Sequence, residues 1–390
     1  MAAAVVFATA TVAAGTTAAA WRQADFAASL YRTTLSSAAA DDNIVLSPWG
    51  VANLFALLQT GARGDTARGM AFALQLGGVE PPAPDAVAAT FRESRTNLSR
   101  ATNDFVALEL SDSLWLKPGF ALSESFRSLA RDAFDADVRF TEMGAKGREA
   151  INAFVSEKTR GRIKNLIQPP ILDNPLTRLV AVDTVYLKAK WQCPFAKVFT
   201  YDQVFHASGG DVKVPFLHAK RQTEILDAPE CAALRLPYRF NTMEMLVVLP
   251  SPSNSLAEIE AKISGPWLGR LAASPWCGEA AIALPKFDFG SEHDLSKTLP
   301  SMGMGAAFDA DRADFGGITP NLFIGAAIQK ANITIDEDGT EAAAATDVVL
   351  PACAPTEERQ RPFVADRPFL FIIRETRTGL ILFLGRVTKP

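Results

Sequence analysis

The segment from residue 337 to residue 362 constrains this chain most, because no part of it has the pattern of a packed element. It follows a predicted strand at 331–336 and contains Gly339, a run of four alanines and three prolines. A loop of about 25 residues without a core pattern is usually functional or disordered. Its first half, 340–349, carries small side chains and only two charged ones. We therefore expect that this half could enter between two existing strands.

Helical spacing predicts helices in the first half of the chain, and β-prone runs predict strands in the second half. The predicted helices are 21–37, 51–59, 65–74 (with Asp65 as the cap) and 151–158; the predicted strands are 43–48, 179–187, 234–236, 243–249, 281–289, 331–336, 369–373 and 380–387. Early helices and late antiparallel strands favour an α+β fold. Because no internal repeat or long polar linker divides the 390 residues, we expect one domain over 21–390.

The first 20 residues are rich in Ala, Val and Thr and carry no charged side chain. Three alanines at 18–20 resemble a signal-peptide cleavage site, but the basic start of a signal peptide is missing. The segment therefore predicts either a signal-like segment or a disordered extension, and the location stays open between extracellular and cytosolic. Later apolar runs are too short to span a bilayer, so we expect no membrane partner.

The composition argues against several classes of function. The 39 basic and 43 acidic side chains are well mixed, which predicts no nucleic-acid partner. The four cysteines and three histidines have no metal-ligand spacing, so we expect no metal and no cofactor. The chain lacks a GxSxG elbow, a P-loop and a dinucleotide fingerprint, and we expect that it is not an enzyme. We also expect a monomer.

Three segments carry a resemblance to a known family. Residues 333–346 (ITIDEDGTEAAAAT) resemble the strand and hinge that precede the reactive loop of an inhibitory serpin. Residues 362–371 (PFVADRPFLF) and 378–386 (TGLILFLGR) resemble the carboxy-terminal signature of this family in its plant-type form. Further matching segments run in family order from about residue 22 to the last residue: 43–48, 151–166, 185–195, 236–238 and 284–287.

The resemblance implies a single domain with three β-sheets, eight or nine helices and an exposed reactive-centre loop. It also implies an irreversible suicide-substrate inhibitor of serine proteases. A protease cleaves the loop and forms an acyl-enzyme, and the freed hinge segment inserts into the main sheet as a new strand. At about 3.3 Å per residue, about 15 inserted residues would move the protease on the order of 50 Å.

The resemblance assigns roles to particular residues of the loop. The expected hinge comprises Glu337, Gly339, Thr340, Glu341, Ala342, Ala343, Ala344, Ala345 and Thr346. Short side chains there suit insertion, whereas the alternative interpretation is a flexible loop without that role. Counting 17 residues from Glu337 places the reactive bond between Cys353 and Ala354. Pro351 and Pro355 disfavour cleavage after the residues that precede them, while cleavage after Ala352 stays open.

The resemblance also points to a sheet-opening region, which comprises Ser47, Trp191, Lys286, Asp183 and Gln329. Lys286 is expected to pair with Glu337, and Trp191 is expected to plug the same end of the sheet. The alternatives are a solvated ion pair that contributes about 0–1 kcal/mol and an ordinary core aromatic.

Three positions of that region depart from the family pattern. Gly50 replaces a serine, Asp183 an asparagine and Gln329 a histidine. A glutamine amide can donate to a carboxylate, and a buried carboxylate is costly unless it is satisfied. We therefore predict that Asp183 and Gln329 form a direct hydrogen bond.

The target class follows from the residue before the reactive bond. A small uncharged Cys353 suits an elastase-like or chymotrypsin-like pocket, and a papain-like cysteine protease is a further candidate. The rival function is a noninhibitory serpin-fold protein that binds or carries a ligand. The hinge favours the inhibitor, and the three departures favour the rival.

Overall fold

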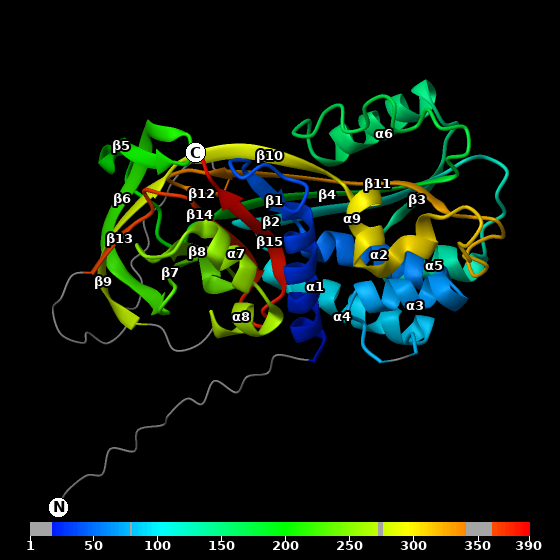
Figure 1. The fold of residues 1–390 in the computed structure, drawn as a ribbon, viewed down its shortest axis with the longest axis horizontal. Helices are drawn as coiled ribbons and strands as arrows, with labels where there is room; N and C mark the ends of the chain where they lie inside the picture. The colour runs from blue at the N-terminus through cyan, green and yellow to red at the C-terminus, as the bar shows by residue number, and fades with distance from the viewer. Residues whose placement is uncertain (1–17, 79, 272–275, 341–360) are drawn as a thin grey trace, which may run out of the picture.

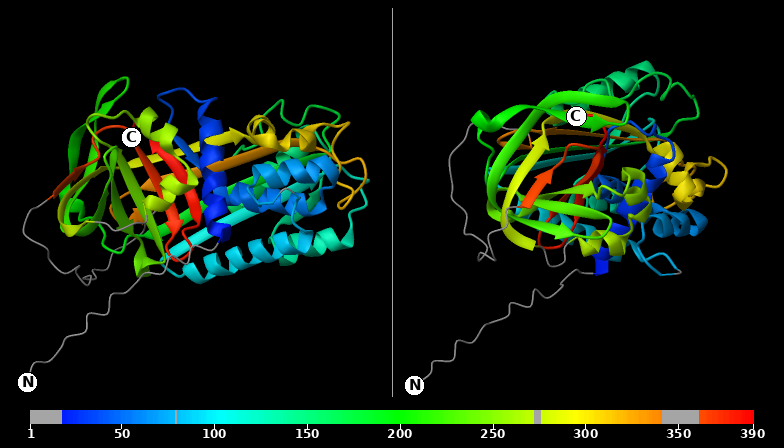
Figure 2. Two further views of the ribbon diagram at one scale, coloured as in Figure 1. Left: turned by 60° about the horizontal axis from the view of Figure 1, so that its bottom comes forward. Right: turned by 60° about the vertical axis from the view of Figure 1, so that its left-hand side comes forward.

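The fold comes from a computed structural model, which describes residues 18–78, 80–271, 276–340 and 361–390. Two β-sheets and a set of helices pack together in one α+β domain (Figure 1). The strands of the larger sheet gather at one end of the molecule, and helices cover the other end (Figure 2). The predicted extension at 1–20 lies almost entirely outside the described residues, because the first described helix begins at Ala18.

The described part of the chain contains nine α-helices, in agreement with the expected eight or nine. They are α1 (Ala18–Leu35), α2 (Pro48–Gly61), α3 (Gly64–Ala73), α4 (Pro84–Ala101), α5 (Glu124–Asp132), α6 (Ala145–Lys158), α7 (Leu256–Lys262), α8 (Gly265–Arg270) and α9 (Leu295–Leu299). None of these helices combines the length and apolar character needed to cross a membrane. In α3 the cap position is Arg63, and Asp65 lies one residue inside the helix rather than capping it.

The six-stranded sheet has the order β10-β11-β12-β4-β2-β3. Its strands are β2 (Val106–Leu116), β3 (Asp137–Phe140), β4 (Leu179–Lys190), β10 (Phe287–Asp294), β11 (Ile324–Ile335) and the two-residue β12 (Gly339–Thr340). Helix α6 lies on one face of this sheet and α2 on the other (Figure 1).

The second sheet has nine strands. Eight follow the order β1-β15-β14-β8-β7-β6-β9-β13, and β5 pairs with β6. These strands are β1 (Ile44–Leu46), β5 (Thr200–Ala207), β6 (Gly210–Asp227), β7 (Cys231–Pro237), β8 (Met243–Pro250), β9 (Trp276–Pro285), β13 (Arg361–Val364), β14 (Phe369–Glu375) and β15 (Ile381–Val387).

The expected three β-sheets appear as two hydrogen-bonded sheets within the described residues, and β6 is the reason. This strand is 18 residues long; it pairs with β5 and β9 over most of its length and with β7 through its last four residues. One continuous strand therefore joins two groups of strands that would otherwise be separate sheets. The fold class is confirmed, and only the division into sheets differs.

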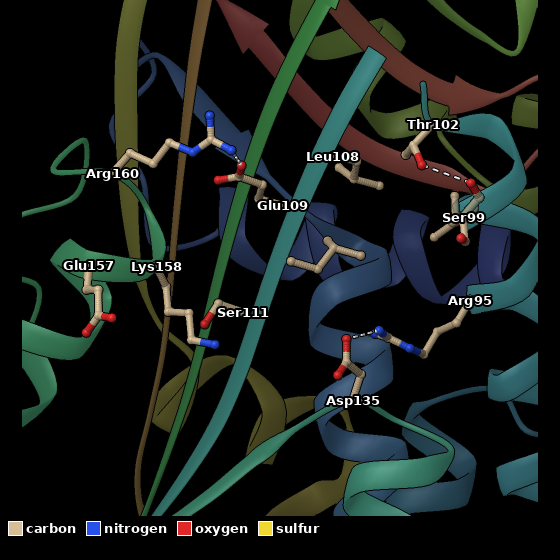
Figure 3. A pocket seen from close by; sticks show the side chains of 12 residues that line it. Arg95, Ser99, Thr102, Leu108, Glu109, Ser111, Asp135, Glu157, Lys158 and Arg160 are labelled. Atoms are coloured by element: carbon tan, nitrogen blue, oxygen red, sulfur yellow. Dashed lines mark hydrogen bonds and ion pairs between the residues drawn. The ribbon is translucent and has the colours of Figure 1, made fainter. Parts of the chain in front are cut away.

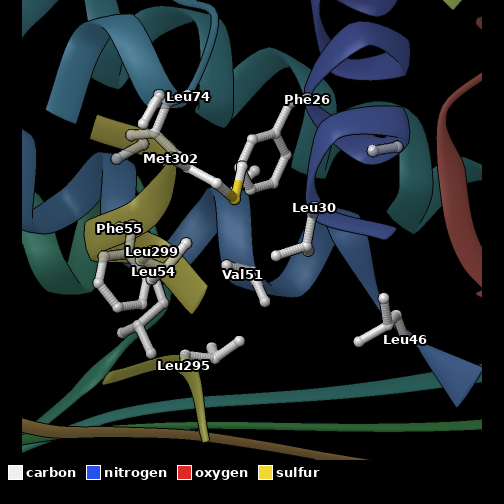
Figure 4. Packing of buried hydrophobic residues seen from close by; sticks show 14 of the residues in the cluster. Phe26, Leu30, Leu46, Val51, Leu54, Phe55, Leu74, Leu295, Leu299 and Met302 are labelled. Carbon is white, nitrogen blue, oxygen red and sulfur yellow. The ribbon is translucent and has the colours of Figure 1, made fainter. Parts of the chain in front are cut away.

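The core is built around α2, in which every residue is buried. Its start is fixed by Ser47, whose hydroxyl accepts a hydrogen bond from the Gly50 amide, and by Pro48 in the first turn. Phe26 and Leu30 of α1 pack with Val51 of α2 in the cluster that Figure 4 shows. On the opposite face of the six-stranded sheet, α6 covers a separate apolar cluster. The central strands are thus buried on both faces.

One predicted strand is two separate strands in the structure. The run 281–289 divides at Lys286, because β9 pairs with β6 in one sheet while β10 pairs with β11 in the other. The amide of Lys286 donates to the carbonyl of Pro215 at the crossing point. The predicted terminal hairpin is confirmed as β14 and β15, whose residues are all buried.

Candidate functional site

The candidate site follows the line along which β4 and β11 meet, which we name the seam. The two strands run parallel and pair directly from Leu179 and Ile324 up to Val185 and Ala331. Beyond this point β12 lies between them, since Thr340 pairs with Ala189 of β4 and with Ile335 of β11. The chain therefore enters the sheet at one end of the seam.

Thr340 is held in this position by an aromatic stack. Its side chain is buried and hydrogen bonds to the hydroxyl of Tyr238 at 2.6 Å. The Tyr238 ring stacks on Trp191, with 4.7 Å between ring centroids and planes 6° apart. The Trp191 indole donates to the carbonyl of Asp336 at 3.0 Å. Trp191 thus lies at this end of the sheet, as the sequence suggested, and fixes the strand that leads into the hinge.

Gly339 occupies a place that another residue could not take without a shift of the chain. Its φ is +155°, and a Cβ there would lie 2.0 Å from the carbonyl oxygen of Ala189. This contact is far inside normal van der Waals distance, so the close approach of β12 to β4 requires glycine.

Glu337 and Lys286 form the predicted ion pair, with Nζ and Oε2 2.8 Å apart. The other carboxylate oxygen of Glu337 accepts from the Thr200 hydroxyl at 2.9 Å. Partial burial alone would raise the pKa of Glu337, but the hydrogen bonds from Lys286 and Thr200 outweigh it and lower this pKa. The amide of Phe195 donates to the Glu337 carbonyl at 2.7 Å and that of Trp191 to the Asp338 carbonyl at 2.9 Å.

The middle of the seam contains the predicted contact between Asp183 and Gln329. These residues are register partners on β4 and β11, and the Gln329 amide Nε2 donates to Asp183 Oδ2. The same Nε2 donates to the Ser47 carbonyl at 2.8 Å, and the Ser47 amide donates to Gln329 Oε1 at 3.0 Å. The predicted hydrogen bond is confirmed, and Ser47 fixes the orientation of the glutamine side chain.

Gly50 belongs to the same arrangement. A Cβ at this position would lie 2.5 Å from Asp183 Oδ2 and 2.6 Å from Oδ1. The carboxyl group of Asp183 therefore lies against the backbone of α2 in the space that a side chain at position 50 would need. The departures at positions 50, 183 and 329 form one connected unit.

Asp112 is a member of this site that the sequence analysis missed. It is the register partner of Asp183 on β2, and its Oδ2 accepts from Asn53 Nδ2 at 2.5 Å. Burial raises the pKa of Asp112 to about 6, against the opposing effect of the Asn53 hydrogen bond. Burial, together with the neighbouring Asp112 carboxyl, raises the pKa of Asp183 well above its usual value. The available signal was Asp112 itself, an acidic residue just before the apolar residues 114–116.

A cavity of about 530 Å³ lies between α4, β2 and the end of α6 (Figure 3). Arg160, just beyond α6, pairs with Glu109 on β2, and Arg95 on α4 pairs with Asp135 at 2.5 Å. None of the predicted site residues that the structure describes lines this cavity. The cavity thus lies between α4 and the end of α6, and the ion pair of Arg160 with Glu109 connects that end of α6 to β2.

Part of the predicted site lies outside the described residues. This part comprises the hinge positions Glu341, Ala342, Ala343, Ala344, Ala345 and Thr346 and the reactive bond between Cys353 and Ala354. The remaining predicted residues divide into two groups: Glu337, Gly339, Thr340, Lys286 and Trp191 lie at the end of the seam, and Ser47, Asp183 and Gln329 lie at its middle. Within the described residues, no group of three metal-binding side chains is present.

The family model described as Serpin (serine protease inhibitor) matches residues 22–390. The chain is 33% identical to an uncharacterized serpin-like protein of Thermococcus kodakarensis over 356 residues, which is 90% of this chain and 81% of the relative. It is 32% identical to glia-derived nexin of Homo sapiens, over 90% of this chain and 88% of the relative.

Among solved structures, human thyroxine-binding globulin matches with a TM-score of 0.86 and 27% identity, over 95% of this chain and 98% of the other. The relatives named here are archaeal and animal proteins, so they give no support to the plant-type form. The match to the family model covers nearly the whole chain and both segments that form the seam. The chain belongs to the serpin family.

Proposed function

We propose that this serpin is an irreversible inhibitor of serine proteases, which acts by loop cleavage, acyl-enzyme formation and insertion of the hinge into the six-stranded sheet. The observation that carries the proposal is the position of β12. Thr340 already lies between β4 and β11, antiparallel to β4. The residues after Thr340 have only to continue in the same direction to become a complete strand.

The registers of the neighbouring strands support this continuation. Six residues beyond Thr340 is Thr346, and six residues back from its partner Ala189 is Asp183. On the other side, six residues back from Ile335 is Gln329. If the strand continued in this register, an inserted Thr346 would lie between Asp183 and Gln329, with its side chain on their face of the sheet. Its hydroxyl could hydrogen bond to either group and replace the contact that insertion breaks.

The alternation of side chains also suits insertion. Thr340 faces the core, so Ala342, Ala344 and Thr346 would face the core as well, and all are small or β-branched. Glu341 would lie on the outer face beside Lys188 of β4. Asp347 would meet Val182, which α6 covers, so insertion to this depth requires α6 to move aside.

The proposed reactive bond is Cys353–Ala354, and the proposed partner is a serine protease of elastase-like or chymotrypsin-like preference. A papain-like cysteine protease is the alternative target. The support is the count of 17 residues from Glu337 and the poor fit of Pro351 and Pro355 on the leaving side of neighbouring bonds. Loop sequencing after incubation with such a protease identifies the bond that is cleaved.

A second candidate function is ligand binding without inhibition. It is favoured by the likeness to human thyroxine-binding globulin and by the altered centre of the seam. The two candidates differ in what happens after the loop is cut. A trap inserts the hinge and gains stability, whereas a carrier of this second kind remains as stable as before.

The test is incubation with elastase-like and chymotrypsin-like proteases, followed by denaturing gel electrophoresis. We expect a complex that survives SDS, and Thr340→Arg should convert the inhibitor into a substrate, because a long charged side chain cannot enter the core face of the sheet. The exposed Lys213→Arg is the control and should still trap. Complete cleavage of the parent protein with no complex would reject inhibition.

A further inference from the structure

Four polar residues form one row across the six-stranded sheet. Asp112 of β2 pairs in register with Asp183 of β4, Asp183 with Gln329 of β11, and Gln329 with His293 of β10. Cross-strand partners share a face of the sheet, and this face is the one that α2 covers. The row therefore crosses the seam at its middle, with two carboxyl groups on one side of the seam and a carboxamide on the other.

The two carboxyl groups belong to register partners on neighbouring strands, and both are buried. Each accepts one hydrogen bond through Oδ2, from Asn53 in the case of Asp112 and from Gln329 in the case of Asp183. In the described part of the chain, Oδ1 of each carboxyl is a buried atom without a hydrogen-bond partner. Two adjacent ionised carboxylates in such a place would repel each other strongly, and a proton between them removes the repulsion.

The surrounding charges do not neutralise the pair. Arg95 of α4 attracts the Asp112 carboxylate, but its guanidinium is already paired with Asp135, whose charge acts in the opposite direction. His293 hydrogen bonds to the Val45 carbonyl at 2.9 Å, and burial lowers the pKa of its imidazole. The raised pKa values of Asp112 and Asp183 agree with retention of a proton by the pair.

We propose that Asp112 and Asp183 form a proton-dependent latch, which shares a proton while β4 and β11 are paired and releases it when the seam opens. The consequence for insertion rests on the proposed inhibitory function. Opening removes Gln329 from Asp183 and admits water. The carboxyl O–H bond then breaks, the proton passes to water, and both carboxylates become ionised and hydrated. Because opening releases a proton, rising pH favours the open seam and falling pH favours the closed one.

His293 acts against this trend. Its lowered pKa means that acid adds a proton to a partly buried imidazole beside Gln329, which weakens the closed state at low pH. The variant His293→Gln removes this effect and should leave the carboxyl-dependent slope in place. It therefore separates the two titrations.

The first experiment tests the shared proton without any protease. Infrared difference spectra of the intact protein at neutral pH should contain the C=O band of a protonated, buried carboxyl. The band should be lost in both Asp183→Asn and Asp112→Asn, because each leaves one carboxylate bonded to an amide. The matched control is Asp288→Asn on β10, an exposed aspartate that accepts from Thr334 at 2.7 Å and should leave the band unchanged. Spectra without the band in the parent protein would overturn the proposal.

The second experiment measures how fast the nicked protein gains stability, as a function of pH between about 5 and 8. The rate should rise by up to about tenfold per pH unit, the limit for release of one proton before the rate-limiting step. Either Asp→Asn variant at the pair should flatten this dependence, and Asp288→Asn should retain it. If one of the two variants fails to fold, the other carries the test.

The two proposals fail differently. A nicked parent protein that inserts fully at a rate independent of pH contradicts the latch but leaves the trap intact. A nicked protein that gains no stability at any pH rejects the trap, and the infrared band then decides on its own whether the pair holds a proton.

Discussion

The carboxamide of Gln329 on β11 donates a hydrogen bond to the Asp183 carboxyl on β4, directly across the seam. The main chain of Ser47 holds the same carboxamide through both its donor and its acceptor. This is the contact that must break before a strand can enter at the middle of the sheet, so its strength affects both the stability of the closed protein and the rate of opening.

Gln329→Ala removes this contact. We expect the free energy of unfolding at neutral pH to fall by about 1–3 kcal/mol, because Asp183 and the Ser47 main chain lose their buried partner. We also expect the nicked protein to insert its loop faster. Urea unfolding measures the first effect. The exposed Gln222→Ala is the control, and equal stability of the two variants would mean that the seam contact contributes nothing.

Gly50→Ala tests the fit between α2 and Asp183. The added methyl group would press against the carboxyl oxygens, and we expect a loss of about 1–3 kcal/mol from overpacking. In an Asp183→Ala background the same change should cost less, because the obstructing group is gone. A double-mutant cycle of urea midpoints measures the coupling. Gly209→Ala, where a Cβ meets nothing within 4 Å, is the control.

Lys286→Met tests the ion pair at the end of the seam. Glu337 has a lowered pKa, so the pair contributes stability above the unfolded-state pKa, and that contribution is lost as pH falls through the folded-state pKa. We expect Lys286→Met to lower the unfolding free energy by about 1 kcal/mol at neutral pH and by less near pH 3. Denaturant unfolding at both values measures the difference. Lys220→Met breaks an exposed ion pair with Glu279 and should lower the unfolding free energy by less at neutral pH. An equal or larger loss would mean that the pair of Lys286 with Glu337 stabilises the protein no more than an exposed pair.

Tyr238→Phe tests how β12 is held. The change keeps the aromatic stack on Trp191 but removes the hydrogen bond to the Thr340 hydroxyl. We expect a loss of about 0.5–1.5 kcal/mol and faster hydrogen exchange of the Thr340 amide. Tyr201→Phe, at an exposed ring stacked on His218, provides the comparison. If both variants exchange alike at Thr340, the tyrosine hydroxyl does not anchor the strand.

Local sequence patterns were sufficient to predict the elements that are mainly apolar and deeply buried. Helix α2 and the hairpin of β14 and β15 are buried throughout, and β4 is buried over its first seven residues, so their sequences are mainly apolar. The strand β2 escaped notice because four polar residues interrupt its sequence and because residues 107–110 are only partly buried. The break at Lys286 was also hidden, since it marks where the chain passes from one sheet to the other, and tertiary pairing alone decides that point.

Prediction of the site residues from the sequence had the same limit. The hydrogen bond between Asp183 and Gln329 could be predicted because both residues depart from a family pattern and a buried carboxylate needs a hydrogen-bond donor. Asp112 was missed because its partnership with Asp183 depends on the register of β2 against β4, between residues 71 positions apart in the sequence. A buried aspartate in a strand indicates that a hydrogen-bond partner exists, but it does not identify the partner.

Helix α2 contacts both sides of the seam, and this has a consequence for any motion of the sheet. Ser47 at its start holds Gln329 on β11, while Asn53, two turns further on, holds Asp112 on β2. When the two halves of the sheet separate, one helix cannot follow both. It must release one of its two anchors, so the hydrogen bonds of Ser47 and Asn53 compete, and the weaker of them determines which half of the molecule travels with the helix.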